Sequence, residues 1–463
     1  MTAPRGTAMD RRAIYDAVDA LAPSLQDACR YLWAHPEPGG KEELSAAYMR
    51  ELVAAHGGVL HDVEGMPYAF WAEWGRGGPT IAILGEHDAL PGLSQEACAT
   101  RAPVVEGGPG HGCGHSLLGP ASAVAAIATK EIMERAGLAG TVRFYGCPQE
   151  ELLSGTVEMI ARGAFEGCDL AITWHPMSST QVWDGGALAN VSARFHFTGR
   201  SSHAAAAPEK GRSALDAVEL MSVGVNYLRE HVIDSARIHY ATDSGGLPPN
   251  IVPPSASSWY YVRAPHMRDV KEILARVEKI AQGAALMTET SVRVEVEGGC
   301  CEIRPAHAFA ALAHEEMMAA PLPRWTEEEL AFARALQESL DPAVVARDEE
   351  TFGCPGPMMD RAGEIELARR APLSASSDIG DVSFVMPLQV FASACWPLGV
   401  SPHTWQATAA CGTSLGEKGA LYAAKVMASL ACALLTRPDA REAIVAEHLA
   451  TRDPSYAPMV PAR

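Results

Sequence analysis

Residues 80–88 read TIAILGEHD, so a nearly continuous apolar run is followed at once by Glu86, His87 and Asp88. A short run of this kind is typical of a strand that is covered on both faces. Such strands belong to largely parallel sheets with helices on both sides. Residues 80–85 therefore predict an α/β fold, with the three polar residues at the end of this strand.

The same arrangement recurs further along, because two more apolar strands also end in polar side chains. Residues 141–147 lead to Glu150 and Glu151, and residues 170–174 end in His175. Helical periods occur before and between the strands, at residues 11–34, 44–55, 116–136 and 157–164. This alternation predicts an α/β catalytic domain with a mixed, largely parallel sheet.

A change of pattern near residue 187 indicates a second domain. Strands are expected at residues 191–198, 237–242, 255–263 and 291–297, and helices at residues 212–231 and 270–287. The order βαββαβ is that of a small two-layer α+β domain. We therefore expect an inserted domain at residues 187–310 between two parts of the first domain, residues 1–186 and 311–463. Its uncovered sheet face or an edge would be available to a partner.

The last part of the chain combines helix signals with one more strand. Residues 326–329 and 414–417 read as capping boxes that open helices. Residues 341–372 have no clear period and are expected to be rich in loops. Residues 388–395 form an apolar strand that leads to His403, and the tail beyond residue 452 is expected to be loose.

The composition is that of a globular protein and excludes several kinds of partner. Of the 463 residues, 48% are hydrophobic and 20% are charged, and the formal net charge is −19. Nucleic acids and anionic membranes require a basic face, which so acidic a chain does not favour. The first residues lack the apolar core of a secretory signal, and eleven cysteines follow no disulfide framework. A cytoplasmic protein with reduced thiols is expected.

Residues 107–115 read GGPGHGCGH, so His111, Cys113 and His115 alternate with glycines. In an extended backbone these three side chains lie on one side, and the glycines allow the chain to pack closely. Imidazole and thiolate groups at this spacing can bind a metal ion. A glycine-rich surface turn that carries histidines by chance is the alternative for this stretch taken alone.

Seven residues of metal-binding or acid–base type lie at, or just after, the carboxyl ends of the predicted strands. They are Asp88, Cys113, His115, Glu150, Glu151, His175 and His403. These ends share one edge of an open α/β sheet, where ligands bind. A thiolate, imidazoles and a carboxylate suit zinc or a neighbouring first-row ion better than calcium or magnesium. Because five ligands exceed the needs of one tetrahedral ion, we expect two ions about 3.5–4 Å apart.

The adjacent carboxylates of Glu150 and Glu151 predict a general base. Neighbouring side chains in non-helical backbone point in different directions, so one carboxylate can bind metal while the other accepts a proton from water. A solvated acidic pair at the end of a strand is the alternative.

Eight blocks between Gly85 and Gln406, in the same order, resemble the family of metal-dependent amidohydrolases and carboxypeptidases. They read GEHDALPGLSQ, GHGCGHSLLG, PQEE, ITWHP, GRSSHAAAAPEKGRSALDAV, PPNIVP, SSDIGDVSF and SPHTWQ. The family includes aminoacylases and indole-acetyl-amino-acid hydrolases, and the blocks are most similar to its aminobenzoyl-glutamate hydrolase and dipeptidase branch. The resemblance covers nearly the whole chain.

The resemblance implies a role for each residue of the site. The ligands of two zinc or manganese ions would be Cys113, His115, Glu151, His175 and His403. Glu150 would act as general base and acid, and Asp88 would orient the site from behind the ligands.

The resemblance also implies that the inserted domain is a lid and dimerisation domain. His203 resembles a histidine that stabilises an oxyanion in the site of a neighbouring subunit. Asn250 and Arg263 resemble residues that hold the carboxylate of the substrate, although an ordinary arginine on a strand face is the alternative for Arg263. A homodimer is therefore expected, and a mixed dimer with a sister subunit stays open.

As a member of this family, the protein would hydrolyse the amide bond of an N-acyl or N-aroyl amino acid, or of a small dipeptide. Two other functions remain open: an aminohydrolase that removes an amine from a small aromatic acid, and a subunit that only binds. Where many relatives have an acidic residue, any residue and then Asp-Ala-Leu-Pro, this chain has an extra imidazole at His87. We expect His87 and His111 in the core or behind the ligands.

Overall fold

The computed structural model describes residues 10–460, except 247, 355 and 360–374. The chain forms two compact units. Unit 1 comprises residues up to 186, 304–371 and 382–456, and unit 2 comprises residues 187–303, 372–381 and those from 457 onward. Each unit is built around a β-sheet of its own.

Within the described residues, the sheet of unit 1 has seven strands in the order β1-β2-β4-β3-β5-β11-β6. They are β1 (Val59–Val63), β2 (Met66–Arg76), β3 (Thr80–Glu86), β4 (Gly140–Cys147), β5 (Leu170–Met177), β6 (Gln181–Trp183) and β11 (Leu388–Ala394). The central strands β4, β3, β5 and β11 run parallel, and β2 and β6 are antiparallel to them. The prediction of a mixed, largely parallel α/β sheet is confirmed.

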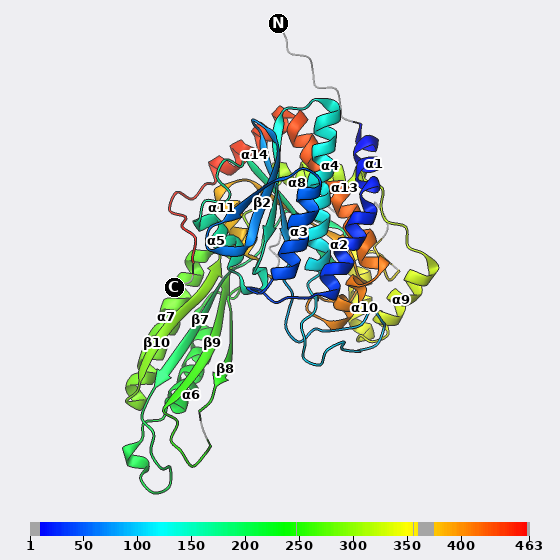
Figure 1. Cartoon of the computed structure of the whole chain (residues 1–463). Helices are drawn as coiled ribbons and strands as arrows, with labels where there is room; N and C mark the ends of the chain where they lie inside the picture. Colours follow the sequence, from blue (N-terminus) through cyan, green and yellow to red (C-terminus); the bar gives the residue numbers. More distant parts are fainter. Residues whose placement is uncertain (1–9, 247, 355, 360–374, 461–463) are drawn as a thin grey trace. The chain divides into compact units, whose positions relative to one another are not determined.

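Helices lie on both sides of this sheet, with α2, α3, α4 and α13 on one side in Figure 1 and α5 and α11 on the other. The helices of unit 1 are α1 (Arg11–Ala20), α2 (Ala22–Ala34), α3 (Glu43–Ala55), α4 (His115–Ala136), α5 (Gly155–Ala161), α8 (His307–Ala319), α9 (Glu327–Gln337), α10 (Pro342–Phe352), α11 (Val382–Val385), α12 (Trp405–Cys411), α13 (Ser414–Thr436) and α14 (Pro438–Ala450).

Close packing of α4 on β3 determines where the candidate site forms. A Cβ atom added at Gly85 would lie 3.1 Å from the Cα of Gly119, and one added at Gly119 would lie 2.7 Å from the carbonyl oxygen of Glu86. Because both positions are glycine, the helix can approach the strand this closely. The first turn of α4, which begins at His115, therefore lies beside the end of β3.

Helix α13 belongs to the core of unit 1. It is long and apolar enough to cross a membrane, with a mean hydropathy of 1.5, but 83% of that stretch is buried inside the protein. Two of its charged residues are paired with the N-terminal helices: Glu417 lies 2.7 Å from Arg30, and Lys425 lies 2.7 Å from Asp19. These contacts are those of a core helix in a globular unit.

Unit 2 has an antiparallel sheet whose four strands in the described residues are ordered β10-β7-β9-β8. The strands are β7 (Ala189–Thr198), β8 (Arg237–Ser244), β9 (Ser255–Ala264) and β10 (Ser291–Cys300). Helices α6 (Ala214–Leu228) and α7 (Met267–Thr288) contact each other and pack together on the sheet. The predicted βαββαβ order is thus confirmed.

The two predicted capping boxes have different outcomes. The first is confirmed, since the backbone N–H of Glu329 donates to the hydroxyl of Thr326 and the carboxylate of Glu329 accepts from the N–H of Thr326. The second is wrong, because Thr413 caps α13 through the N–H of Leu415. The hydroxyl of Ser414 instead donates to Glu329 at 2.6 Å.

The expectation of a loop-rich segment at residues 341–372 is wrong for residues 342–352, which form α10. Asp341 caps this helix through the N–H of Ala343, and Pro342 occupies its first turn. Helix α10 has no buried residue among those described, so it lacks the apolar stripe from which a helical period is read. Residues 360–372 of the predicted segment lie outside the described residues.

Candidate metal centre

The carboxyl ends of the parallel strands bring the predicted polar residues to one edge of the sheet of unit 1. Strand β3 leads to Asp88, β4 leads to the short helical turn η1 (Glu150–Leu152), and β5 carries His175. The first turn of α4 begins at His115, and the loop after β11 leads to His403.

Cys113 joins two groups of potential ligands in this cluster. It lies with His115 and His175 in one group and with Glu151 and His403 in the other, and within each group the donor atoms are no more than 4.8 Å apart. The Sγ of Cys113 lies 3.5 Å from Nε2 of His175. The Nε2 of His403 lies 3.4 Å from Oε2 of Glu151. The five proposed ligands therefore lie together in the structure.

Hydrogen bonds behind the cluster orient two of the imidazoles. The Nδ1 of His115 lies 2.9 Å from Oδ1 of Asp88, and the Nδ1 of His175 lies 2.8 Å from the carbonyl oxygen of Pro176. Because a carboxylate and a carbonyl only accept, each Nδ1 must donate its proton. Both rings are thereby left with Nε2 for a metal ion, an arrangement common behind metal-binding histidines.

The separations within the cluster match those of ligands on a shared ion. Two ligands on one tetrahedral zinc ion are about 3.4 Å apart for a nitrogen and an oxygen, and about 3.6 Å apart for a sulfur and a nitrogen. Within the described part of the chain, Nε2 of His115 and Oε1 of Glu151 are buried and have no hydrogen-bond partner. These residues therefore fit a pair of divalent cations.

The electrostatics of the cluster also favour cations. Burial raises the pKa of Glu151 to about 8, and the neighbouring Glu150 contributes to the rise. Burial lowers the pKa of His175 to about 3, with the nearby His115 adding to the effect, so the imidazole stays neutral. A buried carboxylate next to a second acid is costly without a positive partner, and a neutral imidazole is the form that binds metal.

The turn that carries Glu150 and Glu151 is held in an unusual backbone conformation. Gln149 and Leu153, on either side of η1, have positive φ angles of 61° and 55°. The N–H of Gln149 donates to Glu42 at 2.8 Å, and the N–H of Glu151 donates to Oδ2 of Asp88 at 2.9 Å. Two carboxylates thus fix the turn on both sides of Glu150.

His403 is positioned by a close contact with the glycine-rich stretch. It has a positive φ of 63°, and its N–H donates to the carbonyl oxygen of Gly112 at 2.8 Å. A Cβ atom at Gly112 would lie 2.5 Å from Cδ1 of Leu93 and 3.5 Å from the Cα of His403. Glycine at residue 112 therefore allows the two segments to meet.

His87 and His111 are both buried. Burial lowers the pKa of His87 to about 4 and that of His111 to about 3. Both rings are therefore neutral near pH 7. Among the groups of potential ligands that the described residues form, none includes either histidine.

Three of the predicted site residues lie in unit 2. His203 is exposed, and its Nδ1 accepts from the N–H groups of Ala205 and Ala206 at 3.2 and 3.1 Å. His203 lies beside Asn250, because Ala204 donates to the carbonyl oxygen of Asn250 at 3.0 Å. Arg263 lies near the far end of β9, eight positions after Ser255, and in an extended strand this corresponds to about 26 Å.

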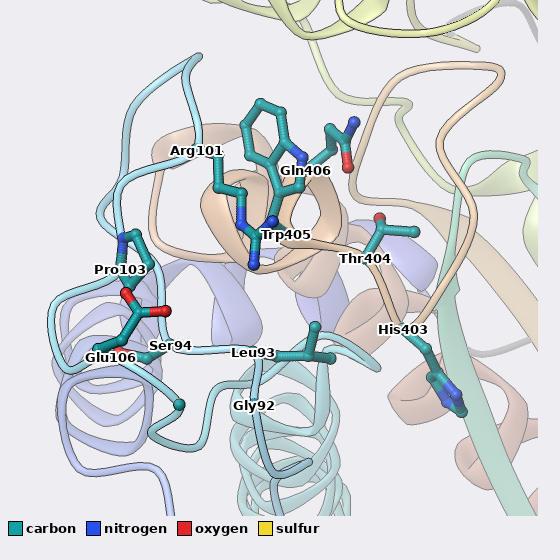
Figure 2. Close-up of a pocket in the computed structure, with 11 residues that line it drawn as sticks. Gly92, Leu93, Ser94, Arg101, Pro103, Glu106, His403, Thr404, Trp405 and Gln406 are labelled. Carbon is teal, nitrogen blue, oxygen red and sulfur yellow. The ribbon is translucent and has the colours of Figure 1, made fainter.

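A pocket of about 300 Å³ adjoins the metal-ligand cluster at His403. Figure 2 shows that one loop supplies Arg101 and Glu106 to the pocket, while the segment entering α12 supplies His403 and Trp405. In the described part of the chain, Arg101 has no hydrogen bond or ion pair. The pocket thus combines an aromatic wall with an available guanidinium group.

Sequence reasoning assigned no role to Glu42 and Glu86, two acidic residues that the structure places at the site. Glu42 is buried and supports the turn at Gln149, whereas Oε2 of Glu86 lies 3.1 Å from Nε2 of His115. Glu42 precedes helix α3 and lies far along the chain from any site motif. The sequence around Glu42 therefore does not indicate a role in the site. Glu86 did have a signal, because it directly ends the apolar strand β3.

Comparison with known proteins adds the evolutionary relationship. Residues 189–288 match the peptidase dimerisation domain of the M20 type. Over 434 residues, the chain is 42% identical to a subunit of p-aminobenzoyl-glutamate hydrolase from Escherichia coli, and the match covers 90% of each chain. This chain belongs to the M20 peptidase family.

Other M20 proteins resemble the chain over most of its length. It is 27% identical over 459 residues to Xaa-Arg dipeptidase from Mus musculus, with 94% of this chain and 91% of the relative covered. A dinuclear metal-binding M20 peptidase from Bacillus subtilis has the same fold, with a TM-score of 0.58, 19% identity, and coverage of 90% and 99%. The protein is therefore a hydrolase of C–N bonds, and its family implies divalent metal ions.

Proposed function

We propose that this M20 hydrolase cleaves the amide bond of an N-acyl or N-aroyl amino acid of the aminobenzoyl-glutamate type, or of a small dipeptide. The relatives that support this substrate class are the p-aminobenzoyl-glutamate hydrolase subunit, Xaa-Arg dipeptidase and an indole-3-acetyl-aspartic acid hydrolase. The observation that carries the proposal is the pair of ligand groups that share Cys113, with the carboxylate of Glu150 beside them.

In this proposal, two divalent ions, zinc or manganese, are held by Cys113, His115, Glu151, His175 and His403. When bound, they supply an activated water and polarise the carbonyl group of the amide. Asp88 holds His115 in the tautomer that presents Nε2, and it also anchors the backbone of Glu151. A single carboxylate thus positions a ligand from each of the two groups.

Glu150 is the general base and acid of the proposed mechanism. It is buried, its Oε2 lies 4.0 Å from Nε2 of His115, and the neighbouring turn holds its backbone in place. This separation exceeds that of two ligands on one tetrahedral ion, which fits a base that lies beside the ligands. From there it can accept a proton from the attacking water and donate it to the leaving amine.

His203 is proposed to stabilise the oxyanion. Because its Nδ1 accepts two backbone N–H groups, a neutral ring carries its proton on Nε2 and can donate it outward. Asn250 lies next to His203 and precedes β9, while Arg263 lies about 26 Å along β9 from Ser255, the first residue of that strand. Asn250 and Arg263 can therefore hold the same small substrate only if they come from two different protomers.

This geometry supports a homodimer formed through unit 2. Its helices expose apolar side chains, with Val223 at 52% and Tyr227 at 76% on α6, and Leu286 at 82% on α7. All three lie in the segment that matches the dimerisation domain. A mixed dimer with a sister subunit is the second possibility, since the bacterial relative is itself named as a subunit.

We propose a cytoplasmic location because the cysteines are unpaired. All eleven are free thiols, and most of them are buried. Unpaired cysteines in this number are typical of a reducing compartment.

The proposal is tested by measuring amine release from p-aminobenzoyl-glutamate, benzoyl amino acids and dipeptides, with the protein stripped by a chelator and then reloaded with Zn²⁺ or Mn²⁺. Hydrolysis is expected only with metal, and Glu150→Gln is expected to bind metal while losing turnover. Release of ammonia from aminobenzoate without amide cleavage would identify an aminohydrolase instead. Binding of substrate without any turnover by the metal-loaded protein would identify a subunit that only binds.

A further inference from the structure

We infer that Glu86 is an additional ligand of the metal ion bound by His115, and this inference depends on the metal-dependent function proposed above. Glu86 is the last residue of β3 and is only 1% exposed. Its Oε2 lies 3.1 Å from Nε2 of His115, and these two residues form with Glu150 a third group whose donor atoms lie within 4.8 Å. His115 therefore belongs to two groups of potential ligands.

The first argument concerns the protons of His115. The Nδ1 of His115 faces Asp88, so Nε2 is the ring atom that faces the carboxylate of Glu86. Within the described residues, no group meets hydrogen-bond geometry with Nε2, although the carboxylate oxygen of Glu86 is so close. A metal ion between these two buried atoms, which are 3.1 Å apart, would be attracted to both.

The separation itself fits a shared ion. A nitrogen and an oxygen on the same zinc or manganese ion lie about 3.0–3.4 Å apart, depending on the coordination number. The distance from Glu86 to His115 falls in this range, as does the 3.4 Å between Glu151 and His403. The 4.0 Å from Glu150 to His115 does not. Glu86 is thus the better candidate for a ligand next to His115, whereas the longer distance of Glu150 fits a base.

Charge gives an independent reason. The five ligands proposed from the sequence include two anions, the thiolate of Cys113 and the carboxylate of Glu151, against two dications. Glu86 supplies a third negative charge. Its side chain is 2% exposed and that of His115 is fully buried, so anions from solvent cannot supply this charge. Unbalanced charge in a buried site is costly, so a third anion stabilises the second dication.

The test measures metal binding directly. Apo-protein is titrated with Co²⁺ in the presence of a competing chelator, and the visible absorption of the bound ions is recorded. Wild type is expected to bind two ions. Glu86→Gln is expected to bind one of them about 10–100-fold more weakly, with a changed absorption for that ion and an unchanged affinity for the other. Glu417→Gln, another buried acid of unit 1 that pairs with Arg30, is the matched control.

Unchanged affinity for both ions and an unchanged spectrum in Glu86→Gln would overturn the inference. If that variant does not fold, Glu86→Asp retains the charge but shortens the side chain. A ligand role then predicts a changed cobalt spectrum, and a wild-type spectrum counts against it. Failure of the wild-type protein to bind Co²⁺ would instead reject the proposed metal-dependent function, so the two failures can be told apart.

Discussion

Asp88 links the two ligand groups of the candidate site, because its carboxylate accepts from Nδ1 of His115 at 2.9 Å and from the backbone N–H of Glu151 at 2.9 Å. Burial would raise its pKa, but the hydrogen bond from His115 prevails and the pKa of Asp88 lies below its usual value. An ionised carboxylate can satisfy both donors at once. The carboxylate of Asp88 thus connects a residue of each candidate ligand group.

Replacing Asp88 with Asn leaves one acceptor oxygen for two donors and turns an NH₂ group toward one of them. We expect Asp88→Asn to weaken metal binding and to lower kcat by about 10–100-fold. Replacing a residue that orients a metal ligand commonly has an effect of this size. Metal affinity by chelator competition and kcat on the best substrate of the amide panel measure the two effects. Asp62→Asn is the control, since Asp62 is an exposed acid on β1. Equal behaviour of the two variants would contradict this role.

Much of this arrangement could be predicted from the sequence, because apolar strands and the residues that directly follow them are local patterns. Residues 80–85 and 141–147 marked two parallel strands, and their ends led to Asp88 and Glu150. Two kinds of feature could not be read locally. Glu42 reaches its partner, Gln149, only through tertiary folding, and α10 buries none of its described side chains and so shows no period.

The pocket beside His403 predicts a preference for substrates with a second carboxylate. Arg101 has no ion pair in the described residues, and a guanidinium group that binds a carboxylate contributes about 1.5–3 kcal/mol when the contact is protected from water. Because Arg101 is exposed, we expect the lower end of that range. Arg101→Gln should reduce kcat/KM for benzoyl-glutamate about 10-fold and leave benzoyl-glutamine unchanged. An equal loss on both substrates would mean that Arg101 has another role.

The turn that carries Glu150 should be intolerant of a side chain at Gly155. A Cβ atom there would lie 1.6 Å from the carbonyl oxygen of Pro148, a backbone atom that cannot rotate away. We expect Gly155→Ala to lower kcat by at least about 10-fold, since small displacements of catalytic groups are costly. Gly283→Ala is the matched control, because its Cβ meets nothing within 4 Å and the residue lies inside α7. Alanine there should stabilise the helix by about 0.5–1 kcal/mol.

His448, on α14, predicts how stability depends on pH. Burial, with Arg304 and Arg452 nearby, lowers its pKa from 6.5 to about 4. Between these values the unfolded chain binds a proton that the folded chain does not, so His448 destabilises the fold as pH falls from 6.5 toward 4. The variant His448→Gln has no group at this position that binds a proton in either the folded or the unfolded state. The Tm of wild type should therefore fall by a few degrees more than that of the variant between about pH 7.5 and 5, measured by circular dichroism. Parallel curves would show that His448 titrates normally in the folded protein.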